Sequence, residues 1–186
     1  MLAPTYPIET PRLLLRPFVP ADFDELFAIR SRPDVTRFLY WEPSSREETA
    51  AELARRVRER TLDREGETLH LAMELRDGGA MIGDVGLTWL SKRHQQGEIG
   101  FVVHPDFHGR GLAREGATEI LRLGFEHFGL HRIIGRCDPQ NEASAGLMRR
   151  LGMRQEAHFV QNEMFKGDWG DELVFAMLAS EWAERV

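Results

Sequence analysis

The sequence predicts an α/β protein of the α+β type: a mixed, mostly antiparallel sheet with one central parallel β-α-β crossover and helices on both faces. Two consecutive stretches between residues 69 and 89 alternate apolar and polar residues, which is the period of half-buried strands. An amphipathic helix farther along lies between two apolar strands, and a helix in that position implies a right-handed parallel crossover. Two more strand-like stretches close the chain, so the sheet is mixed.

The first third of the chain is predicted to form one strand and two helices. The strand is the apolar stretch Arg12–Arg16. Each helix start has the spacing of a capping box, in which a short polar residue and an acidic residue three positions later cap each other. The two pairs are Asp22 with Glu25 and Ser45 with Glu48. We therefore expect a helix to begin at each pair.

Three successive antiparallel strands are expected between residues 69 and 103. The apolar residues of the first strand are Leu69, Leu71, Met73 and Leu75. Asp77–Gly79 is a hairpin turn signal, and residues 81–89 alternate again on the returning strand. A polar loop then leads to an apolar strand at Glu98–Val103.

A turn with two glycines leads from this strand directly into an amphipathic helix. The turn is Pro105–Gly111, the helix spans about Leu112–Phe128, and the strand Arg132–Cys137 follows. The free N–H groups and the dipole of such a helix start form an anion site. Arg110 and Arg114 suit phosphate oxygens. Two interpretations stay open: the turn binds a pyrophosphate, or it is a tight turn without a ligand.

The last third is predicted to contain one short helix and two strands. Asn141 is a good N-cap for a helix over Glu142–Leu151. Gln155–Met164 and Glu172–Leu178 are typical of strands, joined by the turn Lys166–Gly170.

Bulk properties restrict the class of protein. A length of 186 residues favours a single domain over residues 1–186. The net charge of −6 argues against a nucleic-acid partner and suits cationic substrates such as amines. No apolar run approaches a membrane span, and one cysteine without a secretory signal favours the cytoplasm. The histidines show no metal-binding spacing, so no metal is expected.

Two nucleotide-binding motifs can be compared with the glycine turn. A P-loop ends in Gly-Lys followed by Ser or Thr, and the turn contains no lysine. A dinucleotide fingerprint requires a third glycine where Arg114 stands, although Asp138 follows the next strand as that motif would require. Three antiparallel strands precede the turn, and a dinucleotide-binding fold does not have them there. The dinucleotide interpretation is therefore less favoured.

A strand followed by [Gln/Arg]-x-x-Gly-x-[Gly/Ala] and a helix resembles the acetyl-coenzyme A site of the GNAT N-acetyltransferase superfamily, and the surrounding sequence resembles its RimJ/RimL-type branch. His108 stands where Gln or Arg is usual. The matching pieces span nearly the whole chain in the expected order: Thr10–Arg16, Gly97–Phe101, Asn141–Ser144, Leu151–Met153, Trp169–Asp171 and Glu181-Trp182. The resemblance implies a GNAT-type fold.

The resemblance also implies which residues bind acetyl-CoA. The pyrophosphate would be held around the turn by backbone amides, with one arginine nearby. The pantetheine arm would pair with the backbone of the preceding strand, as an added strand does. The cofactor-binding residues implied in this way are Phe101, Val102, Val103, His108, Gly109, Arg110, Gly111, Ala113, Arg114, Asn141 and Ser144.

The implied reaction is direct attack of a primary amine on acetyl-CoA in a ternary complex. The acceptor would be a protein N-terminal α-amine or a small-molecule amine. Glu98 is the candidate base, and its alternative is a strand carboxylate in an ion pair. Ser144 is the candidate acid near the sulfur, and its alternative is a plain first-turn helix residue. Tyr40 and Trp41 would line the acceptor site or simply pack under the second helix.

One departure from the family pattern supports a second function class. The tyrosine that serves as general acid in many GNAT enzymes would fall near Leu147 or Met148, and it is absent. A catalytically weak domain that binds coenzyme A as a sensor or assembly module is therefore the alternative. A homodimer is the expected assembly.

Overall fold

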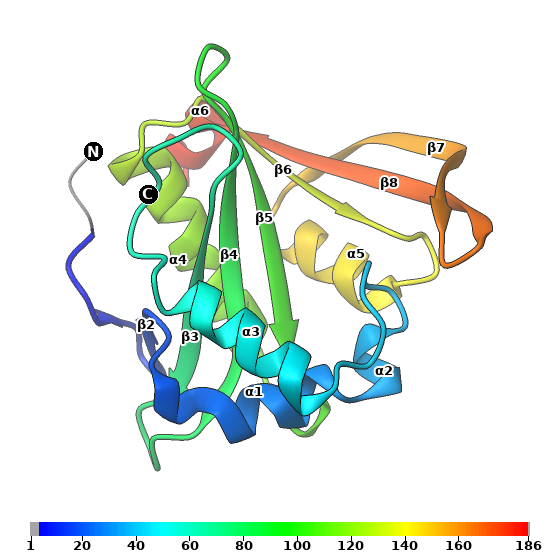
Figure 1. The fold of residues 1–186 in the computed structure, drawn as a ribbon. Helices are drawn as coiled ribbons and strands as arrows, with labels where there is room; N and C mark the ends of the chain where they lie inside the picture. Colours follow the sequence, from blue (N-terminus) through cyan, green and yellow to red (C-terminus); the bar gives the residue numbers. More distant parts are fainter. Residues whose placement is uncertain (1–3, 186) are drawn as a thin grey trace.

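The structure, a computed structural model, describes residues 4–185, in which eight strands form one sheet (Figure 1). Their order across the sheet is β1-β2-β3-β4-β5-β6-β8-β7. All neighbouring strands are antiparallel except β5 and β6, which are parallel. The strands are β1 (Ile8–Glu9), β2 (Leu13–Arg16), β3 (Thr68–Leu75), β4 (Met81–Ser91), β5 (Gln96–Val103), β6 (Arg132–Cys137), β7 (Arg154–Phe165) and β8 (Asp168–Leu178). The predicted fold class is confirmed.

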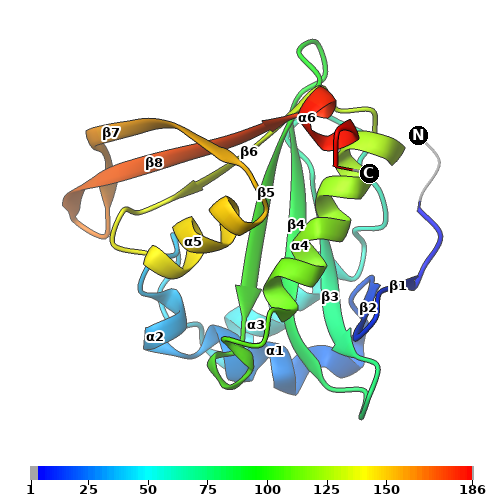
Figure 2. The same cartoon turned by 180° about the vertical axis from the view of Figure 1, so that it is seen from behind.

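Helices cover both faces of the sheet, as Figures 1 and 2 show from opposite sides. The first three lie on one face, and α4 and α5 lie on the other. The helices are α1 (Phe23–Arg30), α2 (Pro33–Thr36), α3 (Arg46–Arg56), α4 (Leu112–Arg122), α5 (Glu142–Arg150) and α6 (Ala179–Ala183). None of the helices in the described part of the chain has the length and apolar character to cross a membrane.

Strand alternation divides the buried apolar residues between two cores. On β5, Ile99 and Val103 belong to the large core that also holds Ile120 of α4. Val102, one position away, packs against the smaller core with Leu26 of α1. Because successive strand residues face opposite sides, Glu98 and Gly100 lie on the same face as Val102, toward the first three helices.

Only one of the two predicted capping boxes exists. Ser45 and Glu48 cap each other: the Glu48 amide donates to Ser45 Oγ, and the Ser45 amide donates to Glu48 Oε2 at 2.8 Å. The predicted capping box of Asp22 with Glu25 is wrong. The Asp22 carboxylate instead accepts the Val19 amide at 2.8 Å and binds Arg16 at 2.7 Å, because a guanidinium from β2 competes with the local cap.

Several predicted boundaries also shift. The helix expected over Leu112–Phe128 is regular only to Arg122 and continues as a π-helical turn over Leu123–His127. Strands β7 and β8 are longer than expected, and only Lys166 and Gly167, both with positive φ, separate them. The short β1 and α6 were not predicted, because each has too few residues to show a period.

The two parallel strands separate halfway along their length. They pair only from Gln96 with Arg132 to Glu98 with Ile134. Beyond that point β5 pairs with β4 alone up to Val103, whereas β6 pairs with β8 along its whole length. The strands therefore form a V whose open end lies at their carboxyl ends (Figure 1).

Candidate active site

The turn after β5 has the backbone geometry that an anion site needs. Gly109 and Gly111 have φ values of +73° and +75°, a left-handed conformation that glycine adopts without strain. Gly111 is the N-cap of α4 and offers no side chain to the first N–H groups of the helix. A Cβ on Gly109 would meet no atom within 4 Å, so a ligand can approach this backbone closely.

The predicted side chains around this turn differ in their surroundings. His108 Nε2 donates to the Val103 carbonyl at 2.8 Å, which fastens the turn to the end of β5. The Arg110 guanidinium lies 5.3 Å from the Phe107 ring centre. Arg114 is exposed on the first turn of α4. Both arginines are therefore available to phosphate oxygens, while the imidazole has a structural partner.

A network from the N-terminal segment braces the same turn, and the sequence reasoning missed it. Glu115 of α4 accepts hydrogen bonds from Thr10 Oγ1 at 2.6 Å and from the Arg12 amide and Nε at 2.7 Å. Arg12 Nη1 also donates to the Arg110 carbonyl at 2.8 Å. Burial opposes the charge of Glu115, but these hydrogen bonds outweigh it and lower its pKa. The sequence predicts Arg12–Arg16 as a strand and Thr10–Arg16 as part of the family resemblance, but no sequence pattern indicates these contacts with Glu115.

Helix α5 begins directly after β6, at the open end of the V. Asn141 is its N-cap, as predicted, and its Oδ1 accepts the Ser144 amide at 3.1 Å. A Cβ on Gly135 of β6 would lie 2.6 Å from Met148 Sδ, so a glycine there lets α5 pack closely on the strand. Asn141 and Ser144 are thus placed together beside the separating strands.

A cavity of about 120 Å³ lies on the other face, toward the first three helices. Glu98 of β5 and Arg136 of β6 line it from both sides of the V, together with the α2–α3 loop and the β7–β8 hairpin. Five of its lining residues are acidic and one is basic: Glu98, Asp138, Glu163, Asp171 and Glu172, with Arg136. This charge balance suits a cationic amine.

Glu98 lies where the sequence placed it, and it is also in the ion pair of the alternative interpretation. Arg136 Nε and Nη2 donate to its two carboxylate oxygens, each at 2.9 Å. Arg136 Nη1 lies 3.5 Å from Glu172 Oε1. The hydrogen bonds to Glu98 raise the pKa of Arg136 far above its usual value, despite partial burial.

Glu172 is a site residue that the sequence reasoning missed. It was placed only as the start of the last strand, yet it lies in the cavity with 5% of its surface exposed. Burial raises its pKa, and the charges of Glu163 and Glu98 add to this effect, while Arg136 opposes it. No local pattern marks this residue, because its position depends on how the hairpin folds back over the sheet.

The structure separates the two predicted acceptor residues. Tyr40 lines the cavity, its hydroxyl donates to Glu163 Oε1 at 2.6 Å, and its ring meets Phe165 edge-on at 5.6 Å. Trp41 does not line this cavity; the Arg30 guanidinium lies 4.6 Å above its ring. Tyr40 thus faces the site, whereas Trp41 packs against α1.

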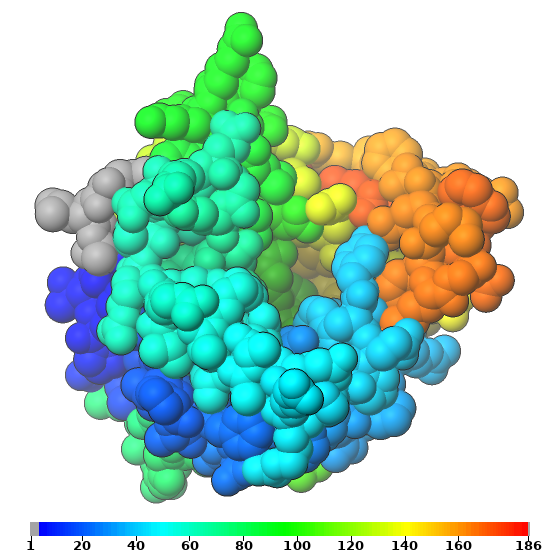
Figure 3. All heavy atoms as spheres, in the orientation of Figure 1, coloured from blue at the N-terminus to red at the C-terminus, as the bar shows by residue number. Residues whose placement is uncertain are grey.

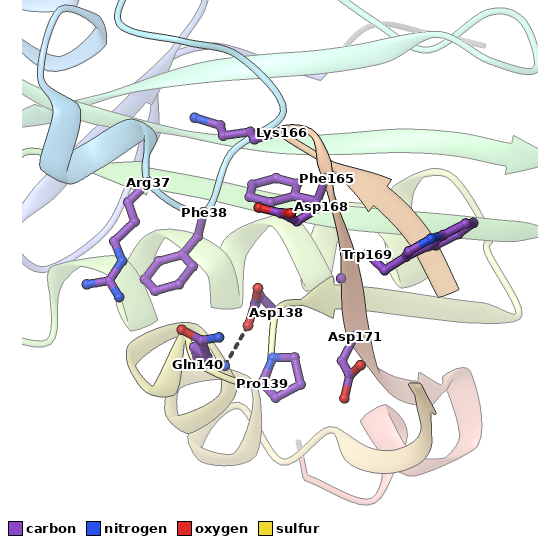
Figure 4. Close-up of a pocket in the computed structure, with 11 residues that line it drawn as sticks. Arg37, Phe38, Asp138, Pro139, Gln140, Phe165, Lys166, Asp168, Trp169 and Asp171 are labelled. Carbon is purple, nitrogen blue, oxygen red and sulfur yellow. Dashed lines mark hydrogen bonds between the residues drawn. The ribbon is translucent and has the colours of Figure 1, made fainter. Parts of the chain in front are cut away.

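A larger cavity of about 480 Å³ continues from the first and shares Phe38, Asp138, Phe165, Gly170 and Asp171 with it. Figure 4 shows Arg37 and Phe38 on one side and Phe165 and Trp169 of the hairpin on the other. Lys166 Nζ donates to the Thr36 carbonyl at 3.0 Å, which ties the hairpin tip to the end of α2. Figure 3 shows the surface hollowed between this loop, α3 and the hairpin.

Cys137 also lines the small cavity, and its thiol is a poor nucleophile. Burial, with a smaller effect of Asp138, raises its pKa to about 11. The reactive species of cysteine is the thiolate, so the thiol stays protonated at neutral pH. Within residues 4–185, no group of three or more His, Cys, Asp and Glu side chains is arranged to hold a metal ion.

Comparison with known proteins shows the family of the chain. A family model described as an acetyltransferase (GNAT) domain matches residues 12–154. An uncharacterized N-acetyltransferase, YnaD, of Bacillus subtilis (strain 168) is 31% identical over 175 residues, which cover 94% of this chain and 98% of that protein. The ribosomal protein uS5 alanine N-acetyltransferase of Escherichia coli (strain K12) is 27% identical over 84 residues, 45% of this chain and 43% of that enzyme.

Solved structures agree with this result. A GNAT-family acetyltransferase from Bacillus anthracis superposes with a TM-score of 0.84 at 27% identity, covering 94% of this chain and 99% of that one. A spermidine N-acetyltransferase from Vibrio cholerae, in complex with CoA and spermine, has the same fold with a TM-score of 0.79 at 20% identity, covering 94% and 99%. The chain therefore belongs to the GNAT family of acetyl-CoA-dependent N-acetyltransferases.

Proposed function

We propose that this enzyme moves the acetyl group of acetyl-CoA to a primary amine by direct attack in a ternary complex. The acceptor is a protein N-terminal α-amine or a small-molecule amine. The observation that carries the proposal is the acidic cavity at the V, where Glu98 of β5 and Arg136 of β6 line the same space. An amine held there lies beside the gap that opens between the two strands.

Acetyl-CoA would bind along the other side of this gap. The amides of Gly109, Arg110, Gly111 and Ala113 would hold the pyrophosphate at the start of α4, with Arg114 near it. The backbone of Phe101–Val103 is without a β6 partner and would pair with pantetheine. Asn141 would hydrogen-bond the same arm, and Ser144 would lie near the sulfur.

The reaction needs little chemistry from the protein beyond positioning and one proton acceptor. The amine enters protonated and gives a proton to a carboxylate of the cavity. Its lone pair attacks the thioester carbonyl, the C–N bond forms, and the C–S bond breaks. A backbone N–H of β5 would stabilise the oxyanion. The attacking nitrogen then loses a second proton, which Ser144 or water would relay to the thiolate. Holding both reactants together supplies much of the rate.

The acceptor class follows from charge. With five acidic side chains and one basic side chain around the small cavity, a protonated amine is attracted and an anionic acceptor is repelled. Two of the proteins similar to this chain are named for acceptors of this kind, a ribosomal-protein alanine and spermidine. Both kinds therefore belong in an acceptor screen.

The test is a melting-temperature screen with acetyl-CoA, followed by release of the CoA thiol with polyamines, amino acids, and Ala- or Ser-ended peptides. We expect acetyl-CoA to raise the melting temperature and at least one amine to be acetylated. Ser144→Ala should lower kcat by about tenfold or more if its hydroxyl donates the proton. Binding without turnover on every amine would instead support the sensor or assembly module.

A further inference from the structure

We propose that Glu172 accepts the proton that the acceptor amine loses, and that the ion pair of Glu98 with Arg136 positions the site. This inference rests on the proposed function and names the base of the same reaction. It differs from the expectation drawn from the sequence, in which Glu98 is the base. The structure distinguishes the two carboxylates by what already binds them.

Two of the cavity's glutamates already accept strong hydrogen bonds. Both oxygens of Glu98 accept from Arg136 at 2.9 Å, and a proton on Glu98 would disrupt this bidentate, charge-assisted pair. Glu163 accepts the Tyr40 hydroxyl at 2.6 Å, and this contact joins the loop to the hairpin. A proton on either glutamate would weaken a contact that shapes the cavity.

The two aspartates of the cavity are occupied by the backbone. Asp138 accepts the Gln140 amide at 2.7 Å in the turn before α5. Asp171 accepts the Gln161 amide at 2.9 Å, opposite an irregular stretch of β7. Each carboxylate therefore holds a turn or strand in shape, and protonation would weaken that hydrogen bond.

Glu172 is the most buried of these carboxylates and the most weakly held. It is 5% exposed, and among residues 4–185 its oxygens accept hydrogen bonds only from Asn162 Nδ2 at 3.1 Å and Arg136 Nη1 at 3.5 Å. A buried carboxylate with weak partners loses little when it takes a proton. Glu98, Glu163 and Arg136 are the charged groups that face it, and their combined effect with burial raises its pKa toward the range of an efficient base.

Arg136 and its two glutamate partners leave one negative charge that an ammonium group can neutralise. One guanidinium, that of Arg136, is shared by Glu98 and Glu172, so this trio carries one net negative charge. A protonated amine would neutralise it on entry. One N–H proton then passes to a Glu172 oxygen, and the neutral amine attacks the thioester carbonyl to form the C–N bond. As the C–S bond breaks, the second N–H proton passes to the departing thiolate, directly or through Ser144 or water. The proton on Glu172 leaves to solvent after the product departs.

The experiment compares Glu172→Gln, Glu98→Gln and Glu172→Asp in the full chain, with Glu156→Gln on the same hairpin as the matched control. For each variant, kcat/KM for the best amine of the acceptor screen is measured against pH. Acetyl-CoA affinity is measured separately by calorimetry. With a base, kcat/KM rises with pH and reaches a level region once the base is ionised. Without a base, kcat/KM keeps rising with pH, because the reaction then requires the amine to lose its proton to solvent first.

We expect kcat/KM of Glu172→Gln to fall about 100-fold at pH 7 and to keep rising with pH, without a level region. Glu98→Gln and Glu156→Gln should keep the level region, and acetyl-CoA affinity should hold in all variants. Glu172→Asp should keep that region at a rate about tenfold lower, and it replaces the Gln variant if that one does not fold.

Three outcomes would overturn the inference. Wild-type rates in Glu172→Gln or Glu172→Asp would remove Glu172 from the reaction. Loss of the level region in Glu98→Gln alone would make Glu98 the base. An unmodified enzyme that binds acetyl-CoA and acetylates no amine would overturn the proposed function, and this inference with it.

Discussion

Gly100 is the residue whose missing side chain matters most for the site. It lies two residues beyond Glu98, the last residue of β5 that is paired with β6, and it faces the same side as Glu98. A Cβ added there would meet no atom within 4 Å. The space at Gly100 is therefore not filled by the packing of the protein, and it is open to the reactants of the proposed reaction.

Enlarging this position should remove activity without loss of the fold. In the series Gly100→Ala, Gly100→Ser and Gly100→Val, we expect kcat/KM for the amine to fall stepwise, by about tenfold or more for Val. The melting temperature should hold, because a β-branched residue suits a strand. Full activity in the Val variant would place the reactants elsewhere.

Site residues could be predicted from the sequence where a local pattern marks them. Asn141 caps α5 as expected, and Gly109 and Gly111 adopt the left-handed conformation that a tight turn requires. Glu115 and Glu172 were missed because distant contacts define them. Thr10 and Glu115, for example, are 105 residues apart in the sequence and bind each other at 2.6 Å.

Among the elements, α3 is held to the sheet by a buried ion pair. Arg56 of α3 and Asp84 of β4 are 3% and 5% exposed and lie 2.9 Å apart. Glu52, one turn earlier, also binds Arg56 at 2.7 Å. The loop that carries Tyr40 leads directly into α3, so this pair helps to set the position of the acceptor site.

Removal of one partner should be costly, because it leaves a buried charge less well compensated. We expect Asp84→Asn to lower the free energy of unfolding by about 3 kcal/mol. Arg64→Ala breaks an ion pair in which the Arg64 side chain is 85% exposed. We expect it to lower the free energy of unfolding by less than about 1 kcal/mol. Urea titration of both variants measures the difference, and equal losses would refute the structural role of the buried pair.

Helices and strands could be predicted where a periodic pattern extends over many residues. Prediction failed where a tertiary contact competes with a local pattern. The alternation in β3 and β4 and the apolar stripe of α4 were sufficient to predict these elements. The capping box at Asp22 failed because Arg16 of β2 takes the carboxylate. The π-helical end of α4 also has no signal in a pattern that treats residues 112–128 as one regular helix.

Across the whole molecule, one sheet separates the two proposed binding regions, which face each other through the V. The glycine turn before α4 and helix α5 lie on one face, and the acidic cavity lies on the other, between α2, α3 and the hairpin (Figures 1 and 2). The sheet opens at the parallel pair β5 and β6. This arrangement suits two substrates that meet in the gap, one from each side.

The most direct test of this account is an initial-rate study in which acetyl-CoA and the amine are varied together, with intact-protein mass measured after acetyl-CoA alone. Direct attack predicts intersecting double-reciprocal lines and no acetylated enzyme, since the Cys137 thiol remains protonated at neutral pH. Parallel lines, together with an acetyl group on Cys137 that passes to the amine, would contradict it.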